Sequence, residues 1–193
     1  MRTILIFSCI FISSTLFSQD FDAKNKAIGL SVAIPYANEK LPEGRTYIPY
    51  QLLGFYTLHN FAKQKKNNFW LYLEPQWVVA AYKPKDKYDL EFGANLGLKY
   101  EFNFGKTTLL TAAIGSGPHI ITVETSHQTR GFIFSDNMEL GIRQLFKNSP
   151  WELHLKWRYR HISNANIKKP NKGIDTYMVM LTIARQLTRN DKQ

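Results

Sequence analysis

The sequence is almost without cysteine: its 193 residues include a single one, Cys9. Cys9 lies in an apolar run, residues 4–16, which follows a basic second residue and precedes the small residue Ser18. A basic start, a short apolar core and a small residue at its end are typical of a secretory signal peptide. We therefore expect residues 1–18 to be removed from an exported protein, and residues 19–193 to form one domain without disulfide bonds.

Long hydrophobic runs are also lacking. After residue 18, no window approaches the roughly 20 apolar residues that a transmembrane helix requires, and helical 3.6-residue periodicity is absent. Instead, apolar and polar residues alternate with a period of two, the pattern of a half-apolar strand. In the clearest segment every second residue from Leu90 to Phe102 is apolar or aromatic, while Glu91 and Lys99 fall on the opposite face.

Eight alternating segments predict an all-β protein. They cover residues 26–36, 47–60, 69–82, 89–104, 107–117, 131–146, 151–163 and 175–187. Eight strands with one apolar and one polar face are typical of a small antiparallel outer-membrane β-barrel of the Gram-negative type, whose polar faces fill the lumen. Short and long connections alternate, as expected of periplasmic turns and outer loops. The competing architecture is a soluble lipid-carrier barrel, in which the apolar faces point inward.

Acidic residues are few beside the basic ones, 15 against 25, which gives a net charge of +10. A basic excess indicates an anionic partner. An exported protein rarely meets nucleic acid, so we expect phosphorylated lipid head groups instead. Lys168, Lys169 and Lys172 lie in one predicted outer loop and are candidates for this contact. The alternative for these lysines is an ordinary solvated loop.

The richest chemistry lies in residues 151–175. Every second residue from Trp151 to Tyr159 is apolar or aromatic, and His161 and Ser163 continue this series. A potential base and a potential nucleophile therefore project from the apolar side of a strand. An antiparallel hairpin that pairs His161 with Asp175 also keeps the neighbouring pairs on the apolar face. These pairs are Tyr159 with Tyr177, Trp157 with Val179, and Leu155 with Leu181.

This register would assemble the parts of a nucleophilic site. Ser163 would attack an acyl carbon, His161 would take its proton, and Asp175 would orient the imidazole. Asn164, next to the nucleophile, would donate a hydrogen bond to the developing oxyanion. On residue types alone the alternative is a structural histidine followed by ordinary turn chemistry.

The same segment resembles a known family. HISNA at 161–165, followed by IKKPN at 167–171 and then Gly173, is similar to the signature of the PagL-type lipid A 3-O-deacylases. The resemblance implies an eight-stranded outer-membrane barrel that hydrolyses the ester-linked acyl chain at position 3 of lipid A. It also implies a site on the outer surface of the barrel, within the outer leaflet.

The resemblance assigns roles residue by residue. It implies His161 as the base, Ser163 as the nucleophile and Asn164 as an oxyanion contributor. The sequence departs from the family pattern at two positions, because Asp175 stands where Glu is common and Asn166 stands where Gly is expected. Aspartate is shorter by one methylene, so its hydrogen bond to His161 needs a closer backbone.

Other polar residues receive structural interpretations. Residues 115–119 are expected to be a strand end and turn, because no helix follows to form a phosphate cradle. The histidines at 59, 119 and 127 lack metal-ligand spacing, so we predict neither a metal nor a cofactor. His154 and seven charged residues are expected inside the barrel, where they would form a structural charge network. The seven are Glu74, Glu91, Glu101, Glu139, Arg143, Arg158 and Arg160.

The sequence therefore predicts an outer-membrane serine esterase acting on lipid A or lipopolysaccharide. Two alternatives stay open: a non-catalytic barrel serving membrane structure or adhesion, and a lipid-binding barrel. The oligomeric state is left open, with a homodimer among the possibilities.

Overall fold

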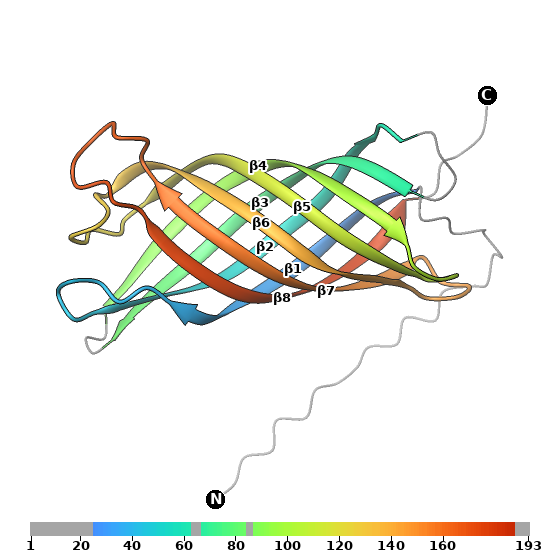
Figure 1. Ribbon diagram of the computed structural model, residues 1–193, viewed down its shortest axis with the longest axis horizontal. Helices are drawn as coiled ribbons and strands as arrows, with labels where there is room; N and C mark the ends of the chain where they lie inside the picture. The colour runs from blue at the N-terminus through green and yellow to red at the C-terminus, as the bar shows by residue number, and fades with distance from the viewer. Residues whose placement is uncertain (1–24, 63–66, 84–86, 188–193) are drawn as a thin grey trace, which may run out of the picture.

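A closed barrel of eight antiparallel strands forms the protein (Figure 1). The computed structural model describes residues 25–62, 67–83 and 87–187. The strands are β1 (Lys26–Asn38), β2 (Thr46–Asn60), β3 (Asn67–Lys83), β4 (Lys87–Asn103), β5 (Thr108–Ile121), β6 (Gly131–Leu145), β7 (Trp151–Ser163) and β8 (Ile174–Leu187). Each strand pairs with its neighbours in sequence, and β1 closes the barrel on β8. The predicted eight-stranded barrel is confirmed, and the predicted signal peptide lies outside the described residues.

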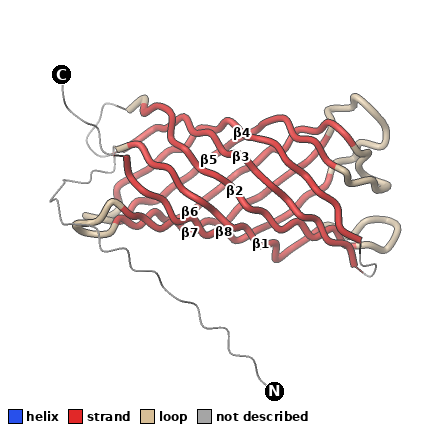
Figure 2. Tube along the Cα trace, turned by 180° about the vertical axis from the view of Figure 1, so that it is seen from behind, coloured by secondary structure: helices blue, strands red, loops and turns tan. Residues whose placement is uncertain are grey.

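The outward side chains of the strands are predominantly apolar, because the alternation places the apolar residues on one face. On β1, Leu30, Val32 and Ile34 point outward and are 49–56% exposed, whereas Ser31 and Ala33 between them are buried in the lumen. Figure 2 shows strands and loops throughout the described chain. No helix in these residues is long and apolar enough to cross a membrane. An apolar outer face is what a lipid-embedded barrel requires, and it is the opposite of a soluble carrier.

Charged side chains fill the lumen in matched pairs. Arg143 lies between two carboxylates, with Nη1 2.7 Å from Glu101 Oε2 and Nη2 2.6 Å from Glu152 Oε2. The other pairs are Arg158 with Glu74 and Glu139, Arg160 with Glu91, Lys156 with Glu139, Lys99 with Glu101, and His154 with Glu152. A buried charge is tolerated when it is paired, so these contacts fix the interior. The predicted charge network is confirmed.

One predicted turn is instead part of a strand. Residues 115–119 were expected to end the fifth strand, but β5 continues to Ile121 and stays paired with β6 through Gly117, Pro118 and His119. The glycine serves close packing, because a Cβ at Gly117 would lie 1.9 Å from the carbonyl oxygen of Ala94 on β4. Glycine and proline were therefore misleading turn signals here.

The two ends of the barrel differ in their connections. The longer loops, residues 39–45, 122–130 and 164–173, lie at one end, on the left in Figure 1, and the shorter turns 104–107 and 146–150 lie at the other. The predicted alternation is confirmed for these five connections. Main-chain hydrogen bonds join two of the long loops, from Lys172 N–H to His127 O at 2.7 Å and from Thr129 N–H to Pro170 O at 3.1 Å. The loop end is therefore a packed platform over the ends of β7 and β8.

Candidate active site

His161 and Asp175 face each other across β7 and β8, as the sequence predicted. The register pairs His161 with Asp175 and continues through Tyr159 opposite Tyr177. His161 Nδ1 lies 2.7 Å from Asp175 Oδ1. Both side chains sit on the outward face and remain partly open, 31% exposed for His161 and 47% for Asp175. The shorter aspartate thus reaches the imidazole without an intervening group.

Asp175 has two further partners that the sequence did not reveal. The phenol of Tyr159 donates to the same carboxylate oxygen, Oδ1, at 2.8 Å. The main-chain N–H of Asp175 donates to Glu39 Oε2 at 3.1 Å, and Glu39 Oε1 lies 3.0 Å from His127 Nδ1. Because Tyr159 lies two residues before His161 in a strand, the sequence indicated that both side chains are on the same face. The contact from Glu39 had no signal because it joins residues 136 apart.

Ser163 ends β7 on the same outward face as His161. It lies opposite Phe134 of β6 and is partly exposed. Within the described part of the chain, no hydrogen bond joins its hydroxyl to the imidazole of His161. Catalytic hydrogen bonds are often long before substrate binds, and a β-strand places residues i and i+2 on one face. The two groups are therefore neighbours on the outward face of the barrel.

The loop after Ser163 is held by its own asparagines. Asn164 is buried, its side-chain nitrogen donates to Lys168 O at 2.7 Å, and its main-chain N–H donates to Asn171 Oδ1 at 2.6 Å. Ala165 and Asn166 have φ angles of 51° and 64°, in the left-handed region. Asparagine tolerates this region better than most residues, so Asn166 adopts the conformation that a glycine would favour at this position.

Gly173 closes the same loop against the imidazole. Its φ is +78°, and a Cβ built on it would lie 2.4 Å from His161 Cε1 and 2.8 Å from His161 Nε2. The sequence placed Gly173 in the motif but did not show this contact. The site therefore needs glycine at 173 for both its backbone conformation and the space it leaves.

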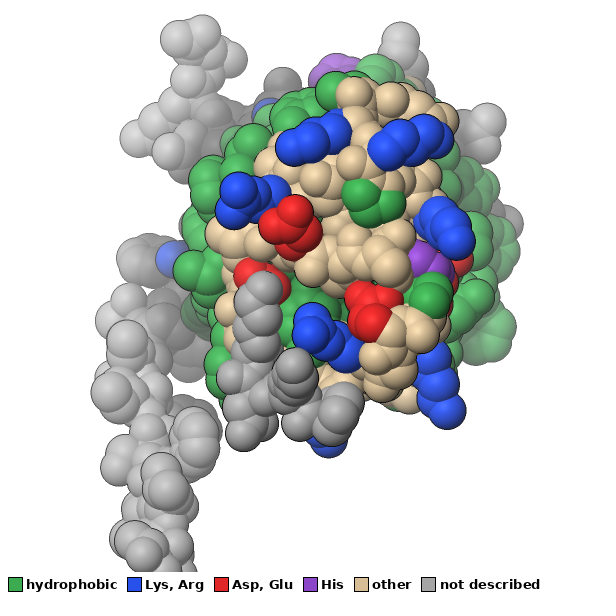
Figure 3. Space-filling model, turned by 90° about the vertical axis from the view of Figure 1, so that its left-hand side faces the viewer, with side chains coloured by type: hydrophobic (Ala, Val, Ile, Leu, Met, Phe, Trp, Pro, Cys, Tyr) green, Lys and Arg blue, Asp and Glu red, His purple; other side chains and the backbone are tan. Residues whose placement is uncertain are grey.

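The three loop lysines are exposed at the rim of the barrel. Figure 3 looks onto this end, where Lys and Arg side chains are spread around the edge with acidic side chains between them. Lys168 and Lys172 extend into solvent, and Lys169 Nζ donates to Asn166 Oδ1 at 3.1 Å. In the described residues, no group of three His, Cys, Asp or Glu side chains has an arrangement suited to a metal ion.

Comparisons with known proteins agree with the barrel fold. The family model described as PagL, lipid A 3-O-deacylase, matches residues 50–184, which is more than half of the chain. The crystal structure of the outer membrane enzyme PagL aligns with a TM-score of 0.64 at 17% identity, covering 80% of this chain and 97% of that chain. The crystal structure of Neisserial surface protein A aligns with a TM-score of 0.51 at 11% identity, covering 84% and 97%.

No curated protein sequence matches the chain. The structural likenesses, at these low identities, support the barrel fold, while the family match covers the strand that carries His161 and Ser163 as well as Asp175. The chain belongs to the PagL family of lipid A 3-O-deacylases, and its barrel lies in the outer membrane.

Proposed function

We propose that this protein is a serine esterase that hydrolyses the ester-linked acyl chain at position 3 of lipid A. The observation that carries the proposal is the 2.7 Å contact between His161 and Asp175 on the outward face, beside the hydroxyl of Ser163. A base and a nucleophile on the lipid-facing surface suit a substrate whose acyl chains are embedded in the membrane. A purely structural barrel has no need of a polar cluster there.

In this proposal the reaction runs through an acyl-enzyme. Ser163 Oγ attacks the ester carbonyl carbon while His161 Nε2 takes the hydroxyl proton; Nδ1 is already committed to Asp175. The proton then passes to the sugar oxygen as its bond to the acyl carbon breaks. A water molecule, deprotonated by His161, attacks the acyl group and releases the fatty acid, which restores the Ser163 hydroxyl.

The oxyanion is assigned to the loop that follows Ser163. The side-chain nitrogen of Asn164 uses one hydrogen for Lys168 O, which leaves its second hydrogen for the oxyanion. The main-chain N–H groups of Ala165 and Asn166 make no hydrogen bond within the described residues and add further donors beside the nucleophile. Fixed donors of this kind stabilise the charge that develops on the carbonyl oxygen.

The loop lysines and the start of the chain complete the proposal. Lys168, Lys169 and Lys172 stand at the outer rim, where the phosphates of lipid A lie above its acyl chains, and each would attract an anionic head group. Residues 1–18 are proposed as the leader that exports the chain to this membrane.

The decisive experiment compares three refolded proteins on lipid A: wild type, Ser163→Ala and Ser149→Ala. Ser149 is the matched control because it lies in a turn at the opposite end of the barrel. Mass spectrometry of the products should show loss of one ester-linked hydroxyacyl chain with wild type and Ser149→Ala, and no loss with Ser163→Ala. Cleavage by Ser163→Ala would refute the serine mechanism. An unchanged lipid A with folded wild type would refute the deacylase and favour a structural barrel.

A further inference from the structure

A groove of about 540 Å³ lies on the outer face of the barrel over β7, β8 and β1. It crosses the seam at which the first and last strands pair and close the barrel. Its apolar side chains are all 48–55% exposed, and they are those of Ile28, Leu30, Val32, Trp151, Leu181 and Ile183. The groove therefore offers an apolar surface to the membrane on both sides of the seam.

One charged side chain lines this apolar groove. Arg185 of β8 pairs with Trp151 of β7 on one side and with Ile28 of β1 on the other, and its side chain is exposed on the outer face. The end of β8 is held against the turn before Trp151, because the N–H of Gln186 donates to Pro150 O at 2.7 Å. In the described part of the chain no carboxylate forms an ion pair with Arg185. A lipid-facing cation of this kind needs an anion from the membrane.

Arg185 and the candidate active site lie at opposite surfaces of the membrane. Asp175 and Arg185 both face outward from β8, ten residues apart. Ten residues of strand extend roughly 33 Å. At a tilt of about 40° they cover roughly 25 Å along the membrane normal, which is the height of the apolar band of such a barrel. Because long loops face outside and short turns face the periplasm, Arg185 lies at the level of the phospholipid head groups of the inner leaflet.

The end of the barrel that carries the short turns, the turn end, has exposed charges of one sign. Among the described residues these are all basic, namely Lys26, Lys106, Lys147 and Arg185. The carboxylates described at this end, Glu101 and Glu152, are buried in the lumen and paired with Arg143. The loop end mixes both signs, as Figure 3 shows. A basic rim at the turn end attracts anionic head groups.

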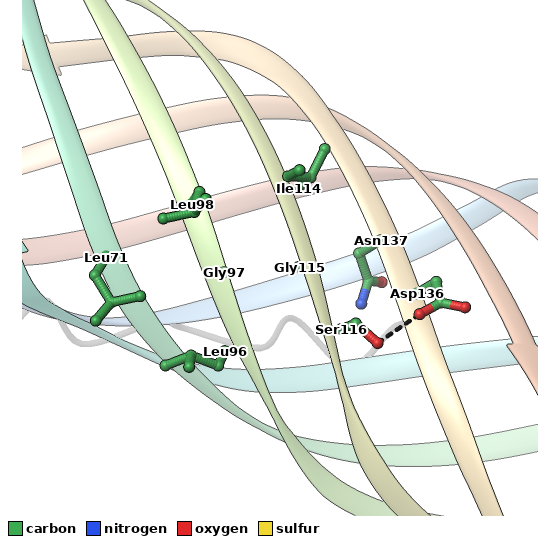
Figure 4. A pocket seen from close by; sticks show the side chains of 9 residues that line it. All are labelled: Leu71, Leu96, Gly97, Leu98, Ile114, Gly115, Ser116, Asp136 and Asn137. Atoms are coloured by element: carbon green, nitrogen blue, oxygen red, sulfur yellow. Dashed lines mark hydrogen bonds between the residues drawn. The ribbon is translucent and has the colours of Figure 1, made fainter.

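A second outer groove, on β3 to β6, has the opposite charge. Figure 4 shows its apolar side chains, with Ser116 and Asp136 joined by a hydrogen bond at one end. A carboxylate repels a phosphate, whereas the guanidinium of Arg185 presents paired N–H donors that match two phosphate oxygens. Of these two grooves, the one over the β1–β8 seam is therefore suited to a phosphate head group.

We propose that the groove over the β1–β8 seam binds an anionic phospholipid of the inner leaflet. Arg185 binds the phosphate, and Lys26 adds a second cation two residues from Ile28, the partner of Arg185. An acyl chain follows the groove from Arg185 to Leu181, roughly 13 Å along β8. The lipid contacts the first and last strands together and so stabilises the closed barrel. The proposed site depends on the orientation of the barrel and not on the esterase.

The test is native mass spectrometry of the refolded protein, titrated with phosphatidylglycerol or with phosphatidylcholine of the same acyl chains. Wild type should retain the anionic lipid about tenfold more strongly or more. Arg185→Gln should lower this ratio about fivefold, the effect of one basic side chain near an anionic head group, and adding Lys26→Gln should bring it close to one. A wild-type ratio near one, or a ratio that Arg185→Gln leaves unchanged, would overturn the inference.

Arg130→Gln is the matched control, because it removes the same charge from an arginine that is 71% exposed and lies at the loop end. It should leave the ratio within about twofold of wild type, since an exposed charge this far away is screened. An equal fall in both variants would mean that overall charge, and not the groove, attracts the lipid.

Leu181→Trp tests the apolar part of the groove. An aromatic side chain facing lipid suits the barrel, so this variant is expected to fold, and its larger side chain occupies the space of the acyl chain. Retention of both lipids should fall several-fold while their ratio stays as in wild type. Unchanged retention would place the lipid elsewhere and overturn the groove as its site. A dimer that carries no lipid would mean that a second copy covers the groove, and would overturn the inference too.

The unfolding temperature gives a second measurement that needs no ester cleavage. A lipid that binds only the closed barrel stabilises it, so phosphatidylglycerol well above its Kd should raise the unfolding temperature of wild type by roughly 5 °C more than phosphatidylcholine does. This difference should shrink in Arg185→Gln and persist in Arg130→Gln. Equal unfolding temperatures of wild type in the two lipids would overturn the stabilisation of the seam.

Discussion

Gly173 lies directly against the imidazole of His161, so that a Cβ at residue 173 would be 2.4 Å from His161 Cε1. Gly173→Ala should therefore push the imidazole out of line and lower kcat about a hundredfold, the cost of a misplacement of roughly 1 Å. The matched control is Gly44→Ala, where φ is +74° but no atom lies within 4 Å of the added Cβ. Kinetics on lipid A should show a loss for the first variant and activity within about twofold of wild type for the second. An equal loss of kcat in both variants would mean that backbone strain, and not contact with the imidazole, causes the effect.

Tyr159 and His161 share one oxygen of Asp175, at 2.8 Å and 2.7 Å. Tyr159→Phe removes one donor to the carboxylate and should lower kcat about tenfold, while Asp175→Asn should lower it roughly 10⁴-fold because the imidazole loses its orienting charge. Tyr177→Phe is the control, because Tyr177 is the cross-strand partner of Tyr159. A loss in Tyr177→Phe equal to that in Tyr159→Phe would point to ring packing in place of the hydrogen bond.

Glu39 links the first long loop to the site through the main chain of Asp175 and through His127. Glu39→Ala should leave the barrel intact but loosen the platform, which would lower kcat several-fold and speed amide hydrogen exchange in residues 122–130. Glu124→Ala is the control, since its contact with Arg130 is 3.8 Å long and both side chains are more than half exposed. Unchanged exchange in Glu39→Ala would show that the loops are held by their main-chain bonds alone.

The loop lysines should act through charge. Replacing Lys168, Lys169 and Lys172 by Gln should raise KM about tenfold or more at low salt, since each basic side chain near an anionic surface contributes roughly 1 kcal/mol. The difference from wild type should shrink as salt is added, because exposed charges are screened. A salt-independent difference would argue for a structural role of the Lys169 contact with Asn166.

Arg143 holds two buried carboxylates, Glu101 and Glu152, inside the barrel. Arg143→Met leaves both without their main counter-charge and should lower the free energy of unfolding by roughly 3–5 kcal/mol. Arg130→Met, at an arginine that is 71% exposed, should change it by less than about 0.5 kcal/mol. Urea unfolding in detergent, followed by tryptophan fluorescence, measures both. A small effect for Arg143→Met would mean that the lumen admits water to these carboxylates.

The alternation of side chains determined most of the fold. A period of two is a local property, so each of the eight strands and its polar face could be predicted from its own residues. The register of His161 with Asp175 could be predicted from β7 and β8 alone, because only one pairing keeps their apolar residues on one face. The turn assigned to residues 115–119 was wrong because glycine and proline signal a turn locally, whereas Gly117 is needed where the backbone of β4 comes close. The residues next to Gly117 in the sequence do not indicate this contact with β4.

The sequence alone identified the candidate catalytic residues, since HISNA, Gly173 and Asp175 stand within one hairpin of 37 residues, Trp151–Leu187. Only the closed barrel decided what surrounds them. Closure turned the apolar faces outward, while loop packing brought Glu39 to Asp175 and Gly173 against the ring of His161. The contact of Glu39 with Asp175 joins residues 136 apart, and the contact of Gly173 with His161 depends on how the loop folds back over β7, so neither could be predicted from a strand pattern.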